Sequence, residues 1–418
     1  MNALAHRLDA NLRPTRHSET LLANQVCNER SRAGQSVYQL GFGQSPFPVP
    51  AHIVNALKQS AHRKEYVGVQ GLPELRRAVA SFHSLSGEDW DPDRVIVGAG
   101  SKILLYCLMA AVERADVALV SPGWVSYEPQ AQLAGHPVFR LDTTFEEKWR
   151  LTPSALDRFC SRRAHVDRPL ILVLNYPGNP DGLTYSPAEL ADLAAVFRRH
   201  GVIVISDEIY GLLHHRGEHA SLAQFYPEGT IVTGGLSKWC GAGGWRLGVM
   251  HIPHALGEHY FQRVIGVCSE TYSCAPAPIQ HAAVSAYSMN DQLQRFLQNQ
   301  RAELSALGRW CATRLQEAGV RVHLPEGGFY LFPDFGDHRA ALQARGIFTS
   351  QQLTRRLLEE EGISLLPGSA LGMPDSSLTV RLAYVDFDGT PALHQGACDT
   401  GKMRRGVQNL CAWIESAD

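Results

Sequence analysis

From residue 94 to residue 251, short apolar runs alternate with segments that carry helix signals. The runs cover residues 94–97, 118–120, 169–174, 202–205, 230–232 and 247–251. Short buried strands that alternate with helices favour a mostly parallel sheet covered by helices on both faces. The sequence therefore predicts an α/β protein with a large domain of this kind.

One of the intervening helices has clear end signals. Ser186 is placed to cap it, Pro187 takes its first position, and Glu189 completes a capping box. Gly201 follows the last turn, where a glycine commonly ends a helix. These signals predict a helix over residues 187–200.

Two further regions flank the alternating unit. A long polar helix over residues 291–318 is predicted to leave it, and a smaller α/β unit follows. The predicted elements of that unit are residues 328–332, 350–361, 363–368 and 378–382. We expect a large domain over 51–300, a small domain over 301–418, and an N-terminal segment over 1–50 that joins the small domain and edges the cleft.

Chemically distinctive residues follow the predicted strands. They are residues 98–101, Trp124, Asn179, Asp207 with Tyr210, and Lys238. The carboxyl ends of parallel strands share one rim of a sheet, and ligands bind outside that rim. Each residue alone has an ordinary explanation, as a helix cap, a packed aromatic or a turn residue. Their occurrence together on one rim favours a binding site.

Lys238 stands in the glycine-rich stretch 234–248, and Arg246 follows it in the same stretch. A lysine held away from bulk water loses its charge more easily and becomes a nucleophilic amine. The arginine offers a planar fork for a phosphate. A surface lysine in a glycine-rich loop is the ordinary alternative, so the other rim residues decide between the two interpretations.

A phosphorylated aromatic aldehyde gives every rim residue a task. Lys238 would form an imine with it, and the Asp207 carboxylate would hold its protonated ring nitrogen, which makes the ring an electron sink. Gly100 and Ser101 open a predicted helix, whose N-terminus suits a phosphate. The remaining assignments are a ring-oxygen hydrogen bond for Tyr210 and Asn179, ring stacking for Trp124, and phosphate contacts for Ser237 and Arg246.

These motifs resemble the class I/II aminotransferases, pyridoxal 5′-phosphate (PLP) enzymes of fold type I, the aspartate aminotransferase fold. The matching pieces are 176–180 (Tyr-Pro-Gly-Asn-Pro), 206–210 (Ser-Asp-Glu-Ile-Tyr), and Ser237-Lys238 with 244–248 (Gly-Trp-Arg-Leu-Gly). Further matches lie in 41–50, 66–76, 98–105, the Trp124 loop, 328–330 and 380–384. The resemblance covers most of the chain and implies a sheet of the seven-stranded type, with a smaller α/β domain built from the two chain ends.

The resemblance also implies a role for each site residue. Lys238, Asp207 and Tyr210 are the implied catalytic residues, with Lys238 as imine lysine and carrier of the Cα proton. The implied cofactor ligands are Gly100, Ser101, Lys102, Trp124, Asn179, Asp207, Tyr210, Ser237, Lys238 and Arg246, with Tyr66 from a partner subunit. The implied substrate contacts are Gly43, Trp124, Asn179 and Arg381, whose fork would clamp the α-carboxylate. The family forms homodimers with active sites at the subunit interface.

The predicted activity is transfer of an amino group from an L-amino acid to a 2-oxo acid, by a ping-pong mechanism through an aldimine of Lys238. PLP-dependent lyases, decarboxylases, cyclases and racemases use the same lysine and aspartate, because the cofactor carries the chemistry. No second arginine is assigned to a side-chain carboxylate, so an aspartate specificity does not follow. Aromatic, aliphatic, alanine-like and specialised donors all stay open.

Three places depart from the family pattern. Asp181 stands where a threonine or serine is usual, and Gly235 stands where a phosphate-binding hydroxyl is often found. The run 239–241 (Trp-Cys-Gly) replaces a commoner Ala-Tyr-Arg type. The last two affect phosphate binding and pocket shape, so they bear on substrate choice more than on cofactor identity.

Composition argues against several other classes. A net charge of −2 with interspersed signs gives no basis for binding nucleic acid or an anionic membrane. Residues 1–14 lack the apolar core of a signal peptide, and no apolar run approaches ~18 residues. The nine cysteines form no CxxC pair. We expect reduced thiols and a cytoplasmic location.

Three rival functions are also disfavoured by the sequence. A DNA-reading regulator would need a basic module, and the N-terminal 40 residues are too few and not basic enough. Residues 98–103 lack the third glycine of a dinucleotide fingerprint and the spacing of a P-loop. His214-His215 has no third ligand at useful spacing, so we expect a solvated loop there and no metal site.

Overall fold

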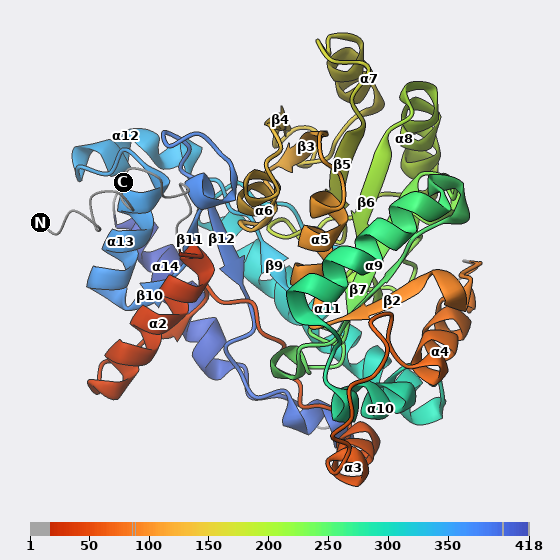
Figure 1. Ribbon diagram of the computed structural model, residues 1–418. Coiled ribbons are helices and arrows are strands. Elements are labelled where there is room, and N and C mark those ends of the chain that lie inside the picture. The colour runs from red at the N-terminus through yellow and green to blue at the C-terminus, as the bar shows by residue number, and fades with distance from the viewer. Residues whose placement is uncertain (1–16, 86, 88, 395–396, 417–418) are drawn as a thin grey trace, which may run out of the picture.

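The computed structural model describes residues 17–85, 87, 89–394 and 397–416. One part of the molecule is arranged around a large sheet, and a smaller unit lies beside it (Figure 1). The strands of this sheet are β2 (Val95–Gly98), β3 (Asp116–Ser121), β4 (Val138–Asp142), β5 (Leu170–Asn175), β6 (Ile203–Asp207), β7 (Thr230–Gly235) and β8 (Gly248–His251). Their spatial order is β2-β8-β7-β6-β5-β3-β4, and β8 alone among them runs antiparallel to its neighbours. The predicted mostly parallel, seven-stranded sheet is confirmed.

Helices cover both faces of the sheet because the strands alternate apolar side chains between the two faces. On β5, Ile171 and Val173 belong to the apolar cluster of one face, whereas Leu172 and Leu174 belong to that of the other. The helices of the first face are α5 (Ser101–Ala110), α6 (Tyr127–Leu133) and α9 (Glu258–Tyr272). Those of the second are α7 (Pro153–Ser161) and α8 (Pro187–His200).

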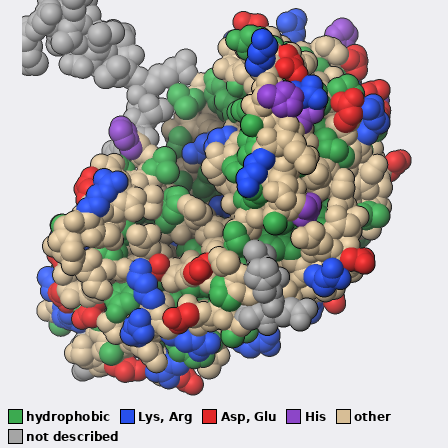
Figure 2. All heavy atoms as spheres, turned by 90° about the horizontal axis from the view of Figure 1, so that it is seen from below, with side chains coloured by type: hydrophobic (Ala, Val, Ile, Leu, Met, Phe, Trp, Pro, Cys, Tyr) green, Lys and Arg blue, Asp and Glu red, His purple; other side chains and the backbone are tan. Residues whose placement is uncertain are grey.

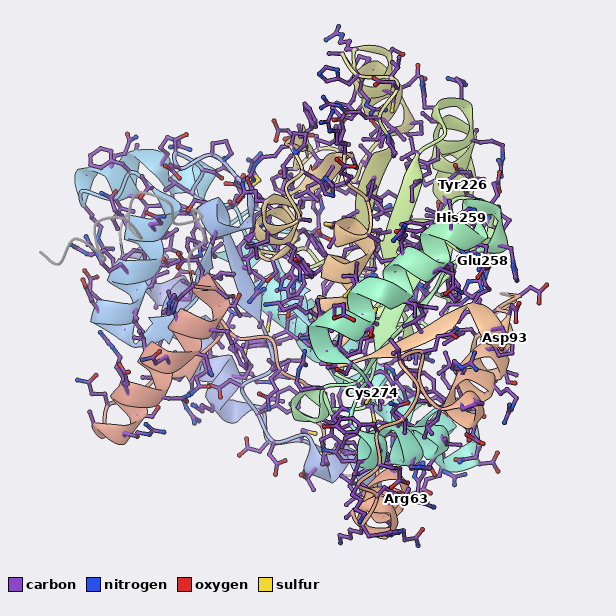
Figure 3. All side chains as sticks on the ribbon, viewed as in Figure 1. Arg63, Asp93, Tyr226, Glu258, His259 and Cys274 are labelled. Carbon is purple, nitrogen blue, oxygen red and sulfur yellow. The ribbon has the colours of Figure 1, made fainter. Side chains whose placement is uncertain are left out.

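An ion pair attaches α9 to the segment that enters β2. Nη1 of Arg94 lies 2.8 Å from Oε2 of Glu258 at the start of the helix. Figure 3 shows Glu258 and Asp93 at the same end of α9. Beyond β2, the helices α3 (Ala51–Ser60), α4 (Pro73–Ser84) and α10 (Ala277–Ala286) pack together, and the long α11 (Asp291–Glu317) follows them in the chain.

The two ends of the chain meet in a second, smaller α/β unit. Its strands are β1 (Tyr38–Gln39), β9 (Tyr330–Leu331), β10 (Ile363–Ser364), β11 (Leu366–Pro367) and β12 (Val380–Ala383). Its helices are α2 (Glu19–Arg32), α12 (Arg339–Ala344), α13 (Ser350–Glu361) and α14 (Gly401–Glu415). The N-terminal strand β1 pairs in parallel with β10. The exact domain bounds stay a prediction, which this pairing supports.

Short 3₁₀ helices complete the described structure. They are η1 (Pro92–Arg94), η2 (Gly211–Leu213), η3 (Leu222–Gln224), η4 (Gly243–Trp245), η5 (His254–Leu256), η6 (Gly336–His338), η7 (Gly368–Leu371) and η8 (Thr390–His394). In the described part of the chain, no helix combines the length and apolar character needed to cross a membrane. The face seen from below carries interspersed acidic and basic side chains (Figure 2).

The predicted end signals of α8 are confirmed. Ser186 and Glu189 form a reciprocal capping box, and Gly201 takes a left-handed conformation at φ 61° after the last turn. Strand β4 was not predicted, because it is an edge strand with mostly half-buried or exposed side chains and gives no apolar run. The element expected over residues 363–368 consists of two short strands, β10 and β11.

The expected solvated loop at His214-His215 is wrong. His214 is buried, and its Nδ1 accepts hydrogen bonds from the backbone N–H groups of Arg216 and Glu218. The ring nitrogens of His215 lie against the carbonyls of Pro325 and Gly328. These histidines therefore join two segments of the chain. Among the described residues, no cluster of three or more His, Cys, Asp or Glu side chains is arranged to hold a metal.

Candidate active site

A cavity of about 520 Å³ lies where the parallel strands end, between the large sheet and the smaller unit. This volume suits a small-molecule ligand. The predicted site residues that line it are Gly43, Ser101, Lys102, Trp124, Asn179, Asp207, Tyr210, Ser237, Lys238, Arg246 and Arg381. Two predicted residues do not line it: Gly100 lies next to Arg246, and Tyr66 is 92% exposed on the surface. The structure therefore brings the other predicted site residues to one cavity, and their roles stay a prediction.

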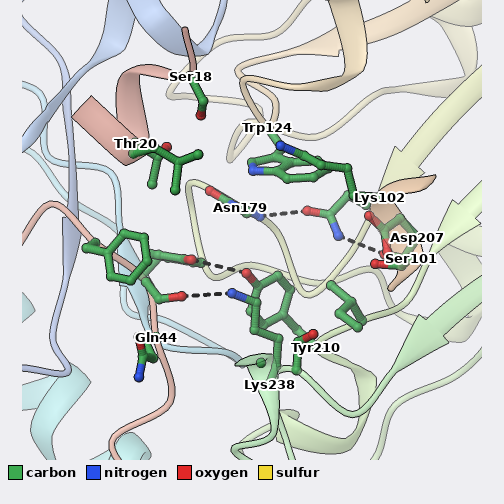
Figure 4. Close-up of a pocket in the computed structure, with 18 of the residues that line it drawn as sticks. Ser18, Thr20, Gln44, Ser101, Lys102, Trp124, Asn179, Asp207, Tyr210 and Lys238 are labelled. Carbon is green, nitrogen blue, oxygen red and sulfur yellow. Dashed lines mark hydrogen bonds between the residues drawn. The ribbon is translucent and has the colours of Figure 1, made fainter. Parts of the chain in front are cut away.

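Lys238 follows β7 and points its amine into the cavity (Figure 4). Its Nζ donates a hydrogen bond to the carbonyl of Gly43 at 2.8 Å. No acidic side chain within the described residues forms an ion pair with it. Burial is the main cause that lowers the pKa of Lys238, and Arg381 and Arg246 add to it. A larger share of this amine is thus neutral than in a solvated lysine.

Asp207 is the last residue of β6 and is only 3% exposed. Its Oδ2 accepts a hydrogen bond from the Tyr127 hydroxyl at 2.7 Å, and its Oδ1 accepts one from Thr233 at 3.3 Å. Burial raises the pKa of Asp207 to about 6, while these hydrogen bonds and that of the Ile209 N–H oppose the rise. The carboxyl group is therefore mostly ionised at neutral pH.

Arg381 on β12 is a buried guanidinium, 1% exposed. It donates to Oδ1 of Asn179 at 2.9 Å and to the carbonyl of Gly41 at 2.8 Å. Among the described residues, Arg381 forms no ion pair with a carboxylate, and its Nε has no hydrogen-bond partner. A buried cation without a counter-ion is costly, so this position suits the carboxylate of a ligand.

The segment that contains Gly43 crosses the cavity and is not a surface linker. Leu40 and Phe47 on either side of it are buried.

Tyr330 lies close to three other residues of the cavity. Its hydroxyl lies 3.1 Å from that of Tyr210, and the Arg381 guanidinium lies 4.7 Å from the centre of the Tyr330 ring. Burial opposes ionisation of Tyr330, but the nearby Lys238 and Arg381 charges lower its pKa below the ordinary value.

The start of α5 forms a cradle for an anion. Arg246 adopts a left-handed backbone conformation at φ 57° and places its guanidinium against Gly100, where a Cβ would lie 2.3 Å from Nη2. A Cβ on Gly248 would lie 2.2 Å from the backbone nitrogen of Ser101. The two glycines thus leave room for the arginine and the helix start to converge. Lys102 adds a cation 5.1 Å from the centre of the Trp124 ring.

A family model described as aminotransferase class I and II matches residues 35–389. The chain belongs to the class I and II aminotransferases. Aspartate aminotransferase of Bacillus subtilis is 32% identical over 377 residues, which cover 88% of this chain and 91% of that protein. Asparagine–oxo-acid transaminase of Streptococcus mutans is 30% identical over 414 residues, 95% and 96% of the two chains. The structure of Thermus thermophilus aspartate aminotransferase with maleate matches at 25% identity with a TM-score of 0.84, covering 99% of this chain and all of that one.

As a member of the class I and II aminotransferases, the protein is a PLP-dependent enzyme that moves an amino group from an L-amino acid to a 2-oxo acid by a ping-pong mechanism. The lyase, decarboxylase and cyclase alternatives are not favoured. The residues present fit PLP. The cavity offers a nucleophilic amine, an ionised carboxylate, and a cradle that Cβ atoms at Gly100 and Gly248 would fill.

Several residues that line the cavity were not singled out from the sequence. They are Ser18, Thr20, Tyr127, Asn175 and Tyr330. Tyr330 lies inside a matched stretch, and Asn175 directly follows a predicted strand, so both had a signal. Ser18 and Thr20 at the start of α2 had none, because only the tertiary fold brings the N-terminal helix to the strand ends.

Proposed function

We propose that the cavity holds PLP between Lys238 and Asp207 and binds the amino acid through Arg381. In this arrangement Arg246, Ser237, Lys102 and the start of α5 at Gly100 and Ser101 hold the phosphate. Tyr210 and Asn179 bind the ring oxygen, and Trp124 stacks on the ring. The observation that carries the proposal is the buried, unneutralised Arg381 in the same cavity as the Lys238 amine.

Each residue then has a defined physical task. PLP supplies an electron-accepting ring and an aldehyde carbon that receives the amino group. The Arg381 fork fixes the α-carboxylate and so orients Cα. The Lys238 Nζ takes the proton from Cα and holds it for return, which its lowered pKa permits. Asp207 keeps the ring nitrogen protonated by offering an ionised carboxylate.

We further propose a donor with a short polar side chain, such as aspartate or asparagine. The relatives carry the names of aspartate and asparagine transaminases, and the Thermus structure was obtained with the dicarboxylate maleate. In this chain, Ser18 and Thr20 at the start of α2 line the cavity. Ser18 precedes the helix, and its side chain makes no capping hydrogen bond to it. The Ser18 hydroxyl is therefore the group proposed to bind a polar side chain of the substrate.

Loss of the visible band of the bound cofactor tests both proposals. The holoenzyme is mixed with aspartate, asparagine, alanine or phenylalanine, each without an oxo acid. We expect aspartate or asparagine to bleach the band fastest, with recovery on adding a 2-oxo acid. Fastest bleaching by phenylalanine or alanine would overturn the proposed donor class, and no band with added PLP would overturn the Lys238 assignment.

A matched pair of variants locates the donor contact. Ser18→Ala removes the hydroxyl and no capping hydrogen bond of α2, so it should lower kcat/KM for the polar donor by about fivefold to tenfold, the effect of one hydrogen bond. The rate with alanine should stay unchanged. An equal loss with both donors would contradict the assigned contact.

We also propose a homodimer in which Tyr66 of each subunit reaches the phosphate of the other. Its 92% exposure in one chain supports an intersubunit role, because a large aromatic side chain that projects so far is a candidate interface anchor. We propose a cytoplasmic location as well, which is supported by nine cysteines that are all free thiols.

A further inference from the structure

Tyr127 lines the cavity and makes a polar contact that packing does not explain. It opens α6, is 5% exposed, and donates its hydroxyl hydrogen to Oδ2 of Asp207 at 2.7 Å. A short hydrogen bond to an ionised, buried carboxylate is among the stronger polar contacts in proteins. The ring alone would fill the same space, so the hydroxyl needs a separate reason.

Tyr127 also contacts Trp124, the residue proposed to stack on the ring of PLP. The rings of Trp124 and Tyr127 meet edge to face, with centroids 5.3 Å apart and an interplanar angle of 80°. Tyr127 therefore lies between two groups that the proposed function places on the cofactor: the carboxylate for the ring nitrogen and the indole for the ring face.

We propose that Tyr127 is a positioning residue that holds the Asp207 carboxylate ionised and aimed at the pyridine nitrogen of PLP. This inference rests on the Asp207 role proposed above. Tyr127 acts through Asp207, with Thr233 as a second and longer donor at 3.3 Å to the other oxygen.

The electrostatics of the pair agree with this role. Burial, followed by the Asp207 charge, raises the pKa of Tyr127 well above its ordinary value, so the phenol stays protonated and always donates. Burial raises the pKa of Asp207, and the Tyr127 hydrogen bond is the largest opposing effect. The other titratable groups that act on this carboxylate are Glu208, Tyr210 and Lys238.

The test uses Tyr127→Phe, which keeps the ring and its contact with Trp124. The first readout is the Kd of the apoprotein for PLP at pH 7.5 (about neutral), measured by equilibrium dialysis in the wild-type and Asp207→Asn backgrounds. We expect Tyr127→Phe to weaken binding about tenfold in the wild type, as for loss of a hydrogen bond to a charged group. We expect no further loss in the Asp207→Asn background.

Three outcomes would overturn the inference. An unchanged Kd for Tyr127→Phe would show that the hydroxyl does not matter to the cofactor. An equal loss in both backgrounds would show that Tyr127 acts through packing. If Asp207→Asn itself leaves the Kd unchanged, the proposed Asp207 role fails and the inference fails with it, so the two failures are distinguishable.

The second readout is the pH dependence of the melting temperature of the apoprotein. Asp207 has a folded pKa of about 6, above the ordinary 3.8, so it lowers stability progressively as pH rises through that window. Without the Tyr127 hydrogen bond this decline should extend to higher pH. We expect Tyr127→Phe to melt like the wild type below the window and at a lower temperature above it. Thr233→Val, which removes the longer bond, should give a smaller change, and a pH-independent shift for Tyr127→Phe would contradict the inference.

Discussion

At the scale of single residues, the site depends on glycines, which leave room for neighbouring groups, as much as on its functional side chains. Gly43 offers its carbonyl to Lys238 at 2.8 Å while the Tyr330 hydroxyl occupies the place of a Cβ, only 1.8 Å from the ideal position. Gly43→Ala must therefore displace either Tyr330 or the segment itself. We expect the rate of the half-reaction with the amino donor to fall more than about tenfold, since overpacking costs about 1–3 kcal/mol and here moves two cavity residues.

Gly234→Ala is the matched control for this change. Gly234 lies close to Lys238 in the chain, but its Cβ would meet only Val249 at an ordinary 3.9 Å. Its half-reaction rate should stay near that of the wild type. Stopped-flow absorbance measures both variants, and an unaffected Gly43→Ala rate would contradict the close approach of Tyr330.

At the scale of elements, the start of α5 works as an anion site only because Gly100 lacks a side chain. Gly100 has a φ of 96°, and its Cβ would lie 2.3 Å from Nη2 of Arg246. We expect Gly100→Ala to weaken PLP binding at least about tenfold, because the guanidinium must leave the helix N-terminus. Equilibrium dialysis of the apoprotein gives the Kd.

Gly346→Ala is the control that separates backbone strain from the loss of PLP binding expected for Gly100→Ala. Gly346 also has a positive φ, 76°, but open space where a Cβ would be. Both variants should lose stability, since alanine is strained in this conformation. Only Gly100→Ala should lose affinity for PLP. A similar Kd for both variants would mean that the cradle does not hold the phosphate.

Helix α8 allows a test of stability that leaves the site alone. Ser186 caps it by accepting a hydrogen bond from the Glu189 N–H, and Glu189 accepts one from the Ser186 N–H. Ser186→Ala should cost about 1 kcal/mol, or roughly 2–4 °C in melting temperature for a domain of this size. The Kd for PLP should not change. Asp192→Ala, an exposed position in the same helix, should shift stability by less than about 0.5 kcal/mol.

The same elements show how far the sequence predicts the structure. Strand ends are predictable because buried parallel strands are apolar on both faces, and so Asn179, Asp207 and Lys238 were placed on one rim correctly. Strand β4 was not predicted, because an edge strand needs no apolar run. Tyr127 and Ser18 were not predicted because their proposed roles depend on which distant groups they meet, and no local pattern encodes that. The sequence thus predicted the rim, and the tertiary fold decided what completes it.

At the scale of the whole molecule, the proposed dimer makes each active site a product of two chains. Lys238→Ala removes the amine of its own site, whereas Tyr66→Ala would damage the site of the partner. A hybrid of the two variants would collect both defects in one site and leave the other intact. Light scattering should first give a mass about twice the 46.0 kDa of the chain.

Mixing the two variants under conditions that exchange subunits then tests the arrangement directly. Neither homodimer should be active at limiting PLP, because each carries one defect in every site. Random exchange makes about half of the dimers hybrids, and each hybrid keeps one intact site, so activity should return to about one quarter of that of the wild type. If Tyr66 served the site of its own chain, every site in the mixture would still carry one of the two substitutions. If Tyr66 served no site, each site would depend on its own Lys238 alone. In both cases mixing would add no activity beyond the average of the two variants. Recovery of activity therefore distinguishes a shared site from two separate ones, and does so without any assumption about the donor.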